Sequence, residues 1–123
     1  MIEVVAGVIY KDNKFLIAQR NLKKSQGGLW EFPGGKVEKN ESYEQALIRE
    51  IKEEFNADIE VDKYIGENLY HYPEKDIKLF FYKARLVSSK IELLEHENYK
   101  WISKNEKDKY EFAGADEKVF DLI

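Results

Sequence analysis

Cysteine is absent from this chain of 123 residues, and basic residues are outnumbered by acidic ones. Without cysteine the chain forms no disulfide and offers no thiolate for catalysis or metal binding, which fits a reducing compartment such as the cytoplasm. The formal net charge is −4 and the isoelectric point is near 5.3. Because proteins that bind duplex nucleic acid usually carry a basic stripe, we expect no duplex nucleic-acid partner.

Long apolar runs, internal repeats and linkers are missing as well. The apolar segment at residues 2–10 is too short to cross a bilayer, and no positively charged leader precedes it, so we expect no membrane partner. No repeat or low-complexity tract divides the chain. The length and the hydrophobic content of 43% suit one globular unit with its own core. We therefore expect a single domain over residues 1–123 in a cytoplasmic protein.

The pattern of apolar and turn-forming residues predicts strands around one long helix. The expected strands cover residues 2–10, 14–19, 58–71, 77–87 and 99–102. Ser42, followed three residues later by Gln45, is a capping-box signal for the start of the helix. Residues 114–123 read as a closing helix. Strands that enclose one helix and end in another predict an α/β sandwich around a mixed sheet.

The long helix carries acids at a spacing that an ordinary helix avoids. Glu50, Glu53 and Glu54 stand at i, i+3 and i+4, and therefore share one face. Each exposed like-charge pair of this kind costs about 0.2–0.5 kcal/mol. Hard divalent ions such as Mg²⁺ and Mn²⁺ prefer carboxylate oxygens and would remove that cost. Taken alone, the cluster is more commonly a solvated acidic face, and Arg49 can pair with Glu53 at i+4.

The segment around these acids resembles the Nudix box of the Nudix hydrolases. The family pattern G-x5-E-x7-R-E-(apolar)-x-E-E is matched by Gly35, Glu41, Arg49, Glu50, Ile51, Glu53 and Glu54. Where the family box ends with Gly and a bulky apolar residue, this chain has Asn56 and Ala57. Asn tolerates the left-handed conformation that closes such a helix. The resemblance implies the Nudix fold, an α/β/α sandwich around a mixed β-sheet.

Residues 29–38 resemble the segment before the box in MutT-type members, which hydrolyse nucleoside triphosphates. The resemblance implies a Mg²⁺ centre, with Mn²⁺ as a possible substitute. The implied ligands are the side-chain carboxylates of Glu50, Glu53 and Glu54 and the backbone carbonyl group of Gly34. Arg49 is implied to orient the acids of the box, which places it with the catalytic residues.

Many MutT-type members carry one more acid, outside the box, that binds metal or acts as the general base. It stands about six residues before a Trp, and Glu95 stands six before Trp101. We therefore expect Glu95 to be a metal ligand and a catalytic residue together with Glu53 and Glu54. Glu97 is the alternative acid, and His96 is a third candidate.

The resemblance also implies contacts with substrate. Arg20 and Lys36 match basic positions that contact phosphates, although an isolated surface cation is usually only that. Tyr72 and Phe112 match positions in the base pocket. Asp116 falls where the family reads the edge of the base, and it is also placed to cap the closing helix.

Three functions follow as hypotheses. The first is a nucleoside-triphosphate pyrophosphohydrolase that sanitises oxidised purine nucleotides such as 8-oxo-dGTP, releasing monophosphate and pyrophosphate. The second enzyme would cleave CTP, dCTP or a damaged pyrimidine nucleotide. The third is a non-catalytic nucleotide-binding module, which is disfavoured because such modules usually lose box glutamates and all are present here. The expected partner is a small nucleotide, and both a monomer and a homodimer are open.

Overall fold

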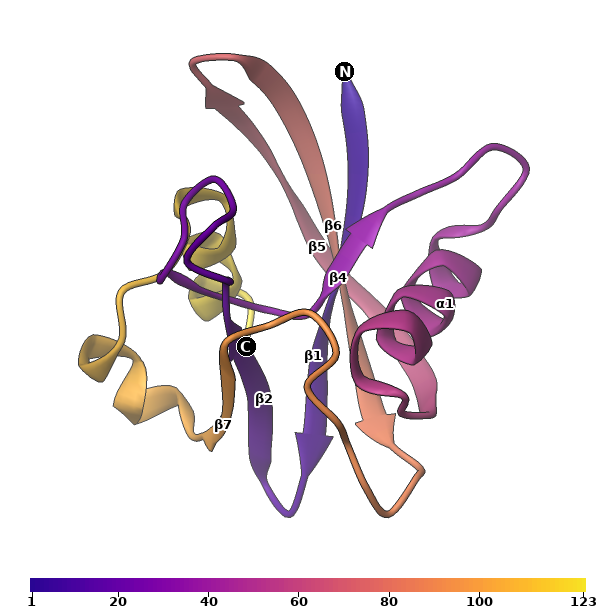
Figure 1. The fold of residues 1–123 in the computed structure, drawn as a ribbon. Helices are drawn as coiled ribbons and strands as arrows, with labels where there is room; N and C mark the ends of the chain where they lie inside the picture. The colour runs from indigo at the N-terminus through magenta and orange to yellow at the C-terminus, as the bar shows by residue number, and fades with distance from the viewer.

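The computed structural model describes all residues, 1–123, and consists of a sheet with helical layers on both sides (Figure 1). The elements in chain order are β1 (Ile2–Lys11), β2 (Lys14–Gln19), β3 (Trp30–Glu31), β4 (Gly34–Lys36), α1 (Tyr43–Phe55), β5 (Ile59–Tyr72), β6 (Lys75–Leu86), β7 (Asn98–Ile102) and two 3₁₀-helices, η1 (Lys104–Lys109) and η2 (Gly114–Asp121). All five expected strands and the expected long helix are present, with ends shifted by at most a few residues.

The sheet is mixed, as the sequence predicts. Its strand order is β3-β2-β1-β6-β5, with β4 paired to β1 and β7 paired to β2. The pairing of β1 with β6 is parallel over its whole length, from Ile2 opposite Ile77 to Tyr10 opposite Arg85, whereas the other pairings are antiparallel. β1 therefore lies at the centre of the sheet, with neighbours on both sides.

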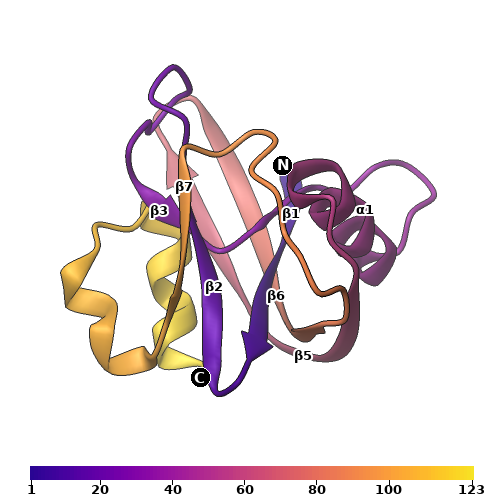
Figure 2. The ribbon, with the colours of Figure 1, turned by 60° about the horizontal axis from the view of Figure 1, so that its bottom comes forward.

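Each face of the sheet carries its own hydrophobic core. Alternate residues of β1 point to opposite faces, so Val5 and Ile9 pack with α1 while Ala6 and Val8 pack with η2. Figure 2 shows α1 and the C-terminal segment on opposite sides of the sheet. This arrangement confirms the predicted α/β/α sandwich.

Local sequence explains both ends of α1. The Ser42 hydroxyl accepts a hydrogen bond from the Gln45 backbone N–H, and the Gln45 side chain accepts one from the Ser42 backbone N–H, which completes the predicted capping box. Asn56 closes the helix in the left-handed conformation, at φ 48° and ψ 41°. In between, the buried face of the helix is formed by Ala46, Leu47, Ile51 and Phe55.

The predicted closing helix at residues 114–123 is present, but it ends two residues earlier than expected. The segment forms the shorter 3₁₀-helix η2, which ends at Asp121. Its course is set by tertiary packing, because Val119 and Phe120 are buried and the Phe120 ring lies 5.0 Å from that of Phe112. Short 3₁₀ segments are common where packing rather than helix propensity determines the backbone.

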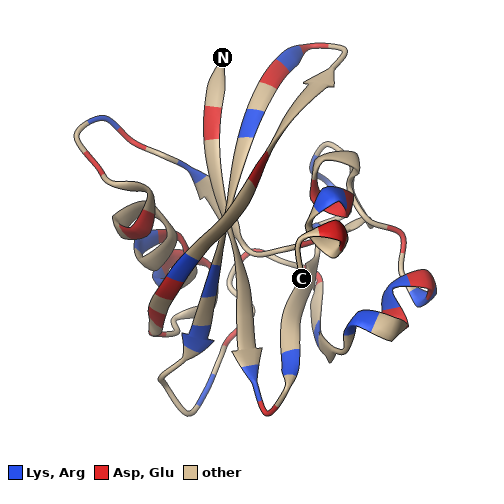
Figure 3. Ribbon diagram, turned by 180° about the vertical axis from the view of Figure 1, so that it is seen from behind, with Lys and Arg blue, Asp and Glu red and all other residues tan.

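Charged residues are interspersed over the ribbon (Figure 3). Across β5 and β6 they form exposed pairs such as Lys78–Glu67 and Arg85–Glu60, each at 3.1 Å. Exposed pairs of this kind contribute about 0–1 kcal/mol each. No helix in the structure is long and apolar enough to cross a membrane.

Candidate active site

A cleft of about 480 Å³ opens between α1, the glycine-containing strand β4 and the tip of the β5–β6 hairpin. Most of the site residues expected from the sequence line it, namely Arg20, Gly34, Lys36, Glu50, Glu54, Tyr72, Glu95 and Asp116. Three expected site residues do not line it, namely Arg49, Glu53 and Phe112. The cleft is also lined by Glu31, which the sequence analysis did not single out, and by His96, which it ranked third.

The glycine pair at β4 lets two groups approach the backbone. A Cβ on Gly34 would overlap the carbonyl oxygen of Val5 on the paired strand β1. A Cβ on Gly35 would overlap the carboxylate of Glu50. Only glycine therefore allows β4 to pair with β1 while the first acid of the helix cluster reaches the cleft.

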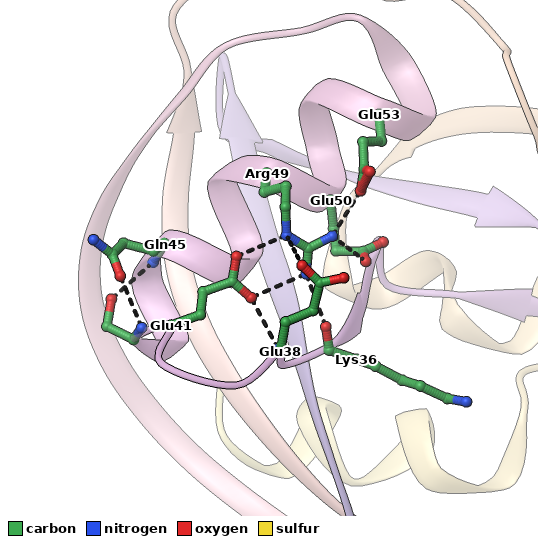
Figure 4. Close-up of polar contacts among 8 residues, drawn as sticks. Lys36, Glu38, Glu41, Gln45, Arg49, Glu50 and Glu53 are labelled. Carbon is green, nitrogen blue, oxygen red and sulfur yellow. Dashed lines mark hydrogen bonds and ion pairs between the residues drawn. The ribbon is translucent and has the colours of Figure 1, made fainter.

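On one side of the acid cluster, Arg49 holds several carboxylates at once (Figure 4). Its guanidinium lies 2.7 Å from Glu41, 2.8 Å from Glu50 and 2.6 Å from Glu53, and it donates to the carbonyl of Lys36 at 3.0 Å. The hydrogen bonds from Arg49 lower the pKa of Glu41. The same contacts raise the pKa of Arg49, so its charge is permanent. Arg49 thus contacts several acids of the box, and its role in orienting them for catalysis stays a prediction.

Glu53 belongs to this Arg49 side of the cluster. Its side chain is 56% exposed and its carboxylate turns to Arg49 rather than into the cleft. Its role as a metal ligand stays a prediction, which requires it to leave Arg49.

Glu54 lies on the other side of the cluster and forms no salt bridge with a Lys or Arg side chain. Its Oε1 is buried without a hydrogen-bond partner. Burial, together with the negative charges of Glu50, Glu31 and Glu95, raises the pKa of Glu54 to about 9. Burial also raises the pKa of Glu50, although Arg49 opposes this. An unpaired buried carboxylate among other carboxylates is the donor set that suits a hard divalent cation.

The acids do not form a finished metal shell by themselves. No group of three or more His, Cys, Asp or Glu side chains is close enough together to hold an ion. Glu50 still bonds to Arg49, and Glu95 approaches Lys24 at 3.5 Å. A bound cation would therefore draw these side chains together from their present partners.

The cationic side of the cleft is formed by the residues that follow β2. Arg20 lies 2.7 Å from Glu31 and donates to the carbonyl of Ser25 at 2.9 Å, so its guanidinium is fixed in place. Lys24 and Lys36 line the same cleft. These cations could neutralise phosphate oxygens, and their contact with substrate stays a prediction.

Asp116, which also lines the cleft, is buried and only 7% exposed. Burial, and then the negative charge of Glu31, raises its pKa well above the ordinary value, although a hydrogen bond from the Phe32 backbone opposes this. The alternative role as a helix cap is wrong, because the cap position of η2 is Ala113 and Asp116 lies within the helix. Asp116 thus remains available to a ligand in the cleft.

Tyr72 fixes the backbone before Asp116. Its hydroxyl accepts a hydrogen bond from the N–H of Ala115 at 3.2 Å, and Asn68 donates to the carbonyl of Ala115 at 3.2 Å. Phe112, in contrast, does not reach the cleft. Its bridge to Trp30 turns its ring onto Phe32, with ring centroids 5.8 Å apart, so it packs in the core.

Comparison with known proteins decides the family. The sequence model of the NUDIX domain matches residues 4–122. The chain belongs to the NUDIX domain family. The CTP pyrophosphohydrolase of Escherichia coli K12 is 40% identical over 116 residues, which cover 94% of this chain and 86% of that protein. An 8-oxo-dGTP diphosphatase of Proteus vulgaris is 45% identical over 82 residues, 66% of this chain and 73% of that protein.

Solved structures agree with this assignment. The solution structure of the E. coli ORF135 protein superimposes with a TM-score of 0.85 at 37% identity, and covers 99% of this chain and 87% of that one. The MutT protein of methicillin-resistant Staphylococcus aureus 252, a Nudix hydrolase by title, gives a TM-score of 0.77 at 43% identity, with coverage of 98% and 92%. The Nudix fold expected from the sequence is confirmed.

Within this Nudix fold, Glu95 and Glu97 differ in position. Glu95 lines the cleft, whereas Glu97 is outside it and donates its backbone N–H to the carbonyl of Gln19 at 2.9 Å. The geometry therefore favours Glu95 as the acid outside the box, and its role in catalysis stays a prediction. The signal for Glu31 was present in the sequence as an acid between the bulky apolar residues Trp30 and Phe32, three residues before the glycine pair.

Proposed function

We propose that this protein is a Mg²⁺-dependent nucleoside-triphosphate pyrophosphohydrolase that removes oxidised purine nucleotides such as 8-oxo-dGTP. The observation that carries the proposal is that three kinds of group line one cleft. They are Glu54, whose Oε1 is buried without a hydrogen-bond partner, fixed cations such as Arg20, and the buried base-reading candidate Asp116. Together they suit the metal, phosphate and base of a nucleotide.

The metal would be held by oxygen donors that already line the cleft. Glu50, Glu54, Glu95 and the carbonyl of Gly34 supply them, and Glu53 would join on leaving Arg49. When bound, Mg²⁺ or Mn²⁺ neutralises charge on the phosphate oxygens and lowers the pKa of the attacking water.

The residues of the chain supply binding and proton transfer. Arg20 and Lys36 bind phosphate oxygens, while Tyr72 and Asp116 bind the base. Glu95 accepts a proton from the water as its oxygen bonds to phosphorus. The bond from that phosphorus to the bridging oxygen breaks, which leaves a nucleoside monophosphate and pyrophosphate. We infer that this occurs in the cytoplasm, within a single domain that spans residues 1–123.

A second substrate, CTP or dCTP, is supported by one specific observation. The relative that covers 94% of this chain is named a CTP pyrophosphohydrolase. Asp116 is compatible with both bases, because its carboxyl oxygens can accept a hydrogen bond from the cytosine amino group or from N–H donors on the edge of guanine.

The test is a panel of oxidised and normal nucleoside triphosphates incubated with Mg²⁺ or with EDTA. We expect Mg²⁺-dependent release of pyrophosphate, with the highest kcat/KM for 8-oxo-dGTP. Release of orthophosphate and a nucleoside diphosphate would contradict the reaction. A higher kcat/KM for CTP would select the second substrate, and binding of nucleotide without hydrolysis would make the protein a binding module. Gel filtration of the same sample distinguishes a monomer from a homodimer.

A further inference from the structure

The chain has two histidines, and each bonds a carboxylate in a different environment. His71 lies 2.7 Å from Asp76 near the end of the β5–β6 hairpin, where its side chain is 67% exposed. His96 lies 2.8 Å from Glu31 at the cleft, where the two side chains are only 6% and 14% exposed. The His96 ring also stacks on Phe55 of α1, with ring centroids 5.1 Å apart and an interplanar angle of 12°. The buried pair is therefore fixed by packing as well as by hydrogen bonding.

Glu31 is bonded through both of its carboxylate oxygens. Oε1 accepts from Arg20 at 2.7 Å, and Oε2 contacts Nε2 of His96 at 2.8 Å. Glu31 thus joins β3 to two segments that are far apart in sequence, the residue after β2 and the loop before β7. With both oxygens occupied by protein groups, Glu31 is placed to orient its neighbours rather than to bind a ligand directly.

His96 lies in a segment that has little regular structure of its own. Residues 87–97, between β6 and β7, form no helix or strand. Backbone hydrogen bonds attach the segment on both sides of the cleft acid, from Leu94 to the carbonyl of Glu54 at 3.1 Å and from Glu97 to that of Gln19 at 2.9 Å. His96 is the buried side chain between these attachments, directly after Glu95. Its contacts with Glu31 and Phe55 therefore limit how far Glu95 can move.

The geometry points to Glu31 and His96 as a positioning pair that sets both Arg20 and Glu95 from one buried hydrogen-bonded unit. Glu31 holds the guanidinium of Arg20, which the proposed function assigns to phosphate, and His96 holds the loop of Glu95, which it assigns to the metal. The inference rests on the proposed function, because that function gives Arg20 and Glu95 their roles. Neither Glu31 nor His96 needs to touch substrate.

The test compares His96→Ala with His71→Ala, a matched control that removes an exposed histidine–carboxylate pair. Binding of Mn²⁺ to the nucleotide-free protein is measured by calorimetry, and kcat and KM are measured separately. We expect His96→Ala to weaken Mn²⁺ binding about 10-fold, within the range seen when groups that orient metal ligands are removed. His71→Ala should leave both readouts unchanged. His96→Gln keeps a side-chain donor for Glu31 and should recover part of the loss.

Two further variants separate the effect of Glu31 on Arg20 from the effect of His96 on Glu95. Glu31→Gln removes the charge that holds Arg20 and should raise KM about 10-fold, with a smaller change in kcat. In a Glu95→Gln background, His96→Ala should weaken Mn²⁺ binding no further, because the group that it positions is already lost.

Specific outcomes would overturn the pair. Equal behaviour of His96→Ala and His71→Ala in both readouts would reduce His96 to a packing residue. A full Mn²⁺ penalty that persists in the Glu95→Gln background would show that His96 acts elsewhere. Thermal unfolding checks that each variant folds, and if His96→Ala does not, His96→Gln and Glu31→Gln carry the test. If the wild type released no pyrophosphate, the proposed function would fail, while the Mn²⁺ comparison would still test the positioning.

Discussion

The acids on one side of α1 share the cation Arg49, while Glu54, on the other side, forms no salt bridge. Arg49 contacts Glu41, Glu50 and Glu53, and its hydrogen bonds lower the pKa of Glu41. Glu54, one residue beyond Glu53, is buried without a partner for Oε1, and burial raises its pKa to about 9. Adjacent residues of one helix thus have opposite electrostatic environments.

The difference shows where the fold leaves room for an external cation. An acid that Arg49 already neutralises gains less from a metal than one that is unpaired and buried, because the desolvation cost of the latter is still uncompensated. The same reasoning separates the two other buried carboxyl groups. Glu31 has a lowered pKa because His96 and Arg20 outweigh its burial, whereas the pKa of Asp116 is raised because burial dominates. Glu54 and Asp116 are therefore the groups that most need a ligand.

The largest effect is expected at Glu54. Glu54→Gln keeps the size of the side chain and removes the charge, so hydrolysis should fall by about 10²-fold or more, equivalent to about 2.7 kcal/mol of the barrier. Without metal, the variant should be as stable as the wild type or more stable at neutral pH, because Gln neither buries a charge nor takes up a proton on folding, as Glu54 must with its raised pKa. Steady-state rates and thermal unfolding, each with Mg²⁺ and with EDTA, measure both effects.

Glu44→Gln provides the control, because Glu44 lies on the same helix but outside the cleft. It should leave the rate unchanged. Near-normal hydrolysis by Glu54→Gln at saturating Mg²⁺ would show that the carboxylate of Glu54 is not a metal ligand. The electrostatic difference between Glu53 and Glu54 would then not explain where the metal binds.

The next largest effect is expected at Asp116, the buried carboxyl group of the cleft. Asp116→Asn should change the ratio of kcat/KM for 8-oxo-dGTP and CTP by roughly 5- to 150-fold, or about 1–3 kcal/mol, since one buried hydrogen bond to the base is gained or lost. Specificity constants for both nucleotides, in wild type and variant, give this ratio. An unchanged ratio would remove Asp116 from the base pocket.

Asp116 also predicts a pH dependence of stability. Because its folded pKa is raised, its contribution to stability is complete below the unfolded pKa and is lost as pH rises above about 4. Asn does not titrate, so the stability of Asp116→Asn relative to wild type should increase from about pH 5 to pH 8. Urea unfolding in EDTA measures this difference, and a flat difference would contradict the burial of an uncompensated acid.

The helix and its acids were predictable because their signals are local. Ser42 and Gln45 fix the start of α1, Asn56 fixes its end, and the spacing of Glu50, Glu53 and Glu54 follows from the helical repeat. The sequence could not show that Glu53 and Glu54 face different partners. That division depends on where Arg49 and the buried loop acids lie in three dimensions.

The sites that sequence reasoning placed less well depend on long-range packing. Phe112 was expected in the base pocket, but its bridge to Trp30 turns it into the core. The closing helix was expected to run to residue 123, with capping as the alternative role of Asp116, but the structure has a 3₁₀-helix that ends at Asp121 and whose cap position is Ala113. Glu31 was missed because its partners, Arg20 and His96, come from distant parts of the chain.

A smaller effect on activity is expected at Glu53, which sharpens the comparison directly. Glu53→Gln removes a carboxylate that contacts Arg49 and is 56% exposed. The variant should lose about 10-fold in activity, less than Glu54→Gln. The loss is smaller because Glu53 can bind a metal ion only after it leaves Arg49. Rates as a function of Mg²⁺ concentration test this. An equal or greater loss than in Glu54→Gln would mean that the Arg49 contact is released in the active state.

The smallest effect concerns what holds Asp116 in the cleft. Tyr72→Phe removes the acceptor for the N–H of Ala115, which should lower the free energy of unfolding by about 0.5–1.5 kcal/mol. Because Asn68 still holds the carbonyl of Ala115, Asp116 should stay in place, and the ratio of kcat/KM for 8-oxo-dGTP and CTP should shift by only about 2- to 5-fold. Tyr70→Phe is the matched control, since its ring lies 4.6 Å from that of Tyr72 and its hydroxyl packs at Gly114. The control should not change the ratio. If Tyr72→Phe shifted the ratio as far as Asp116→Asn, the hydroxyl of Tyr72 would itself contact the base, and the unpaired carboxyl group would no longer be the main determinant of base selection.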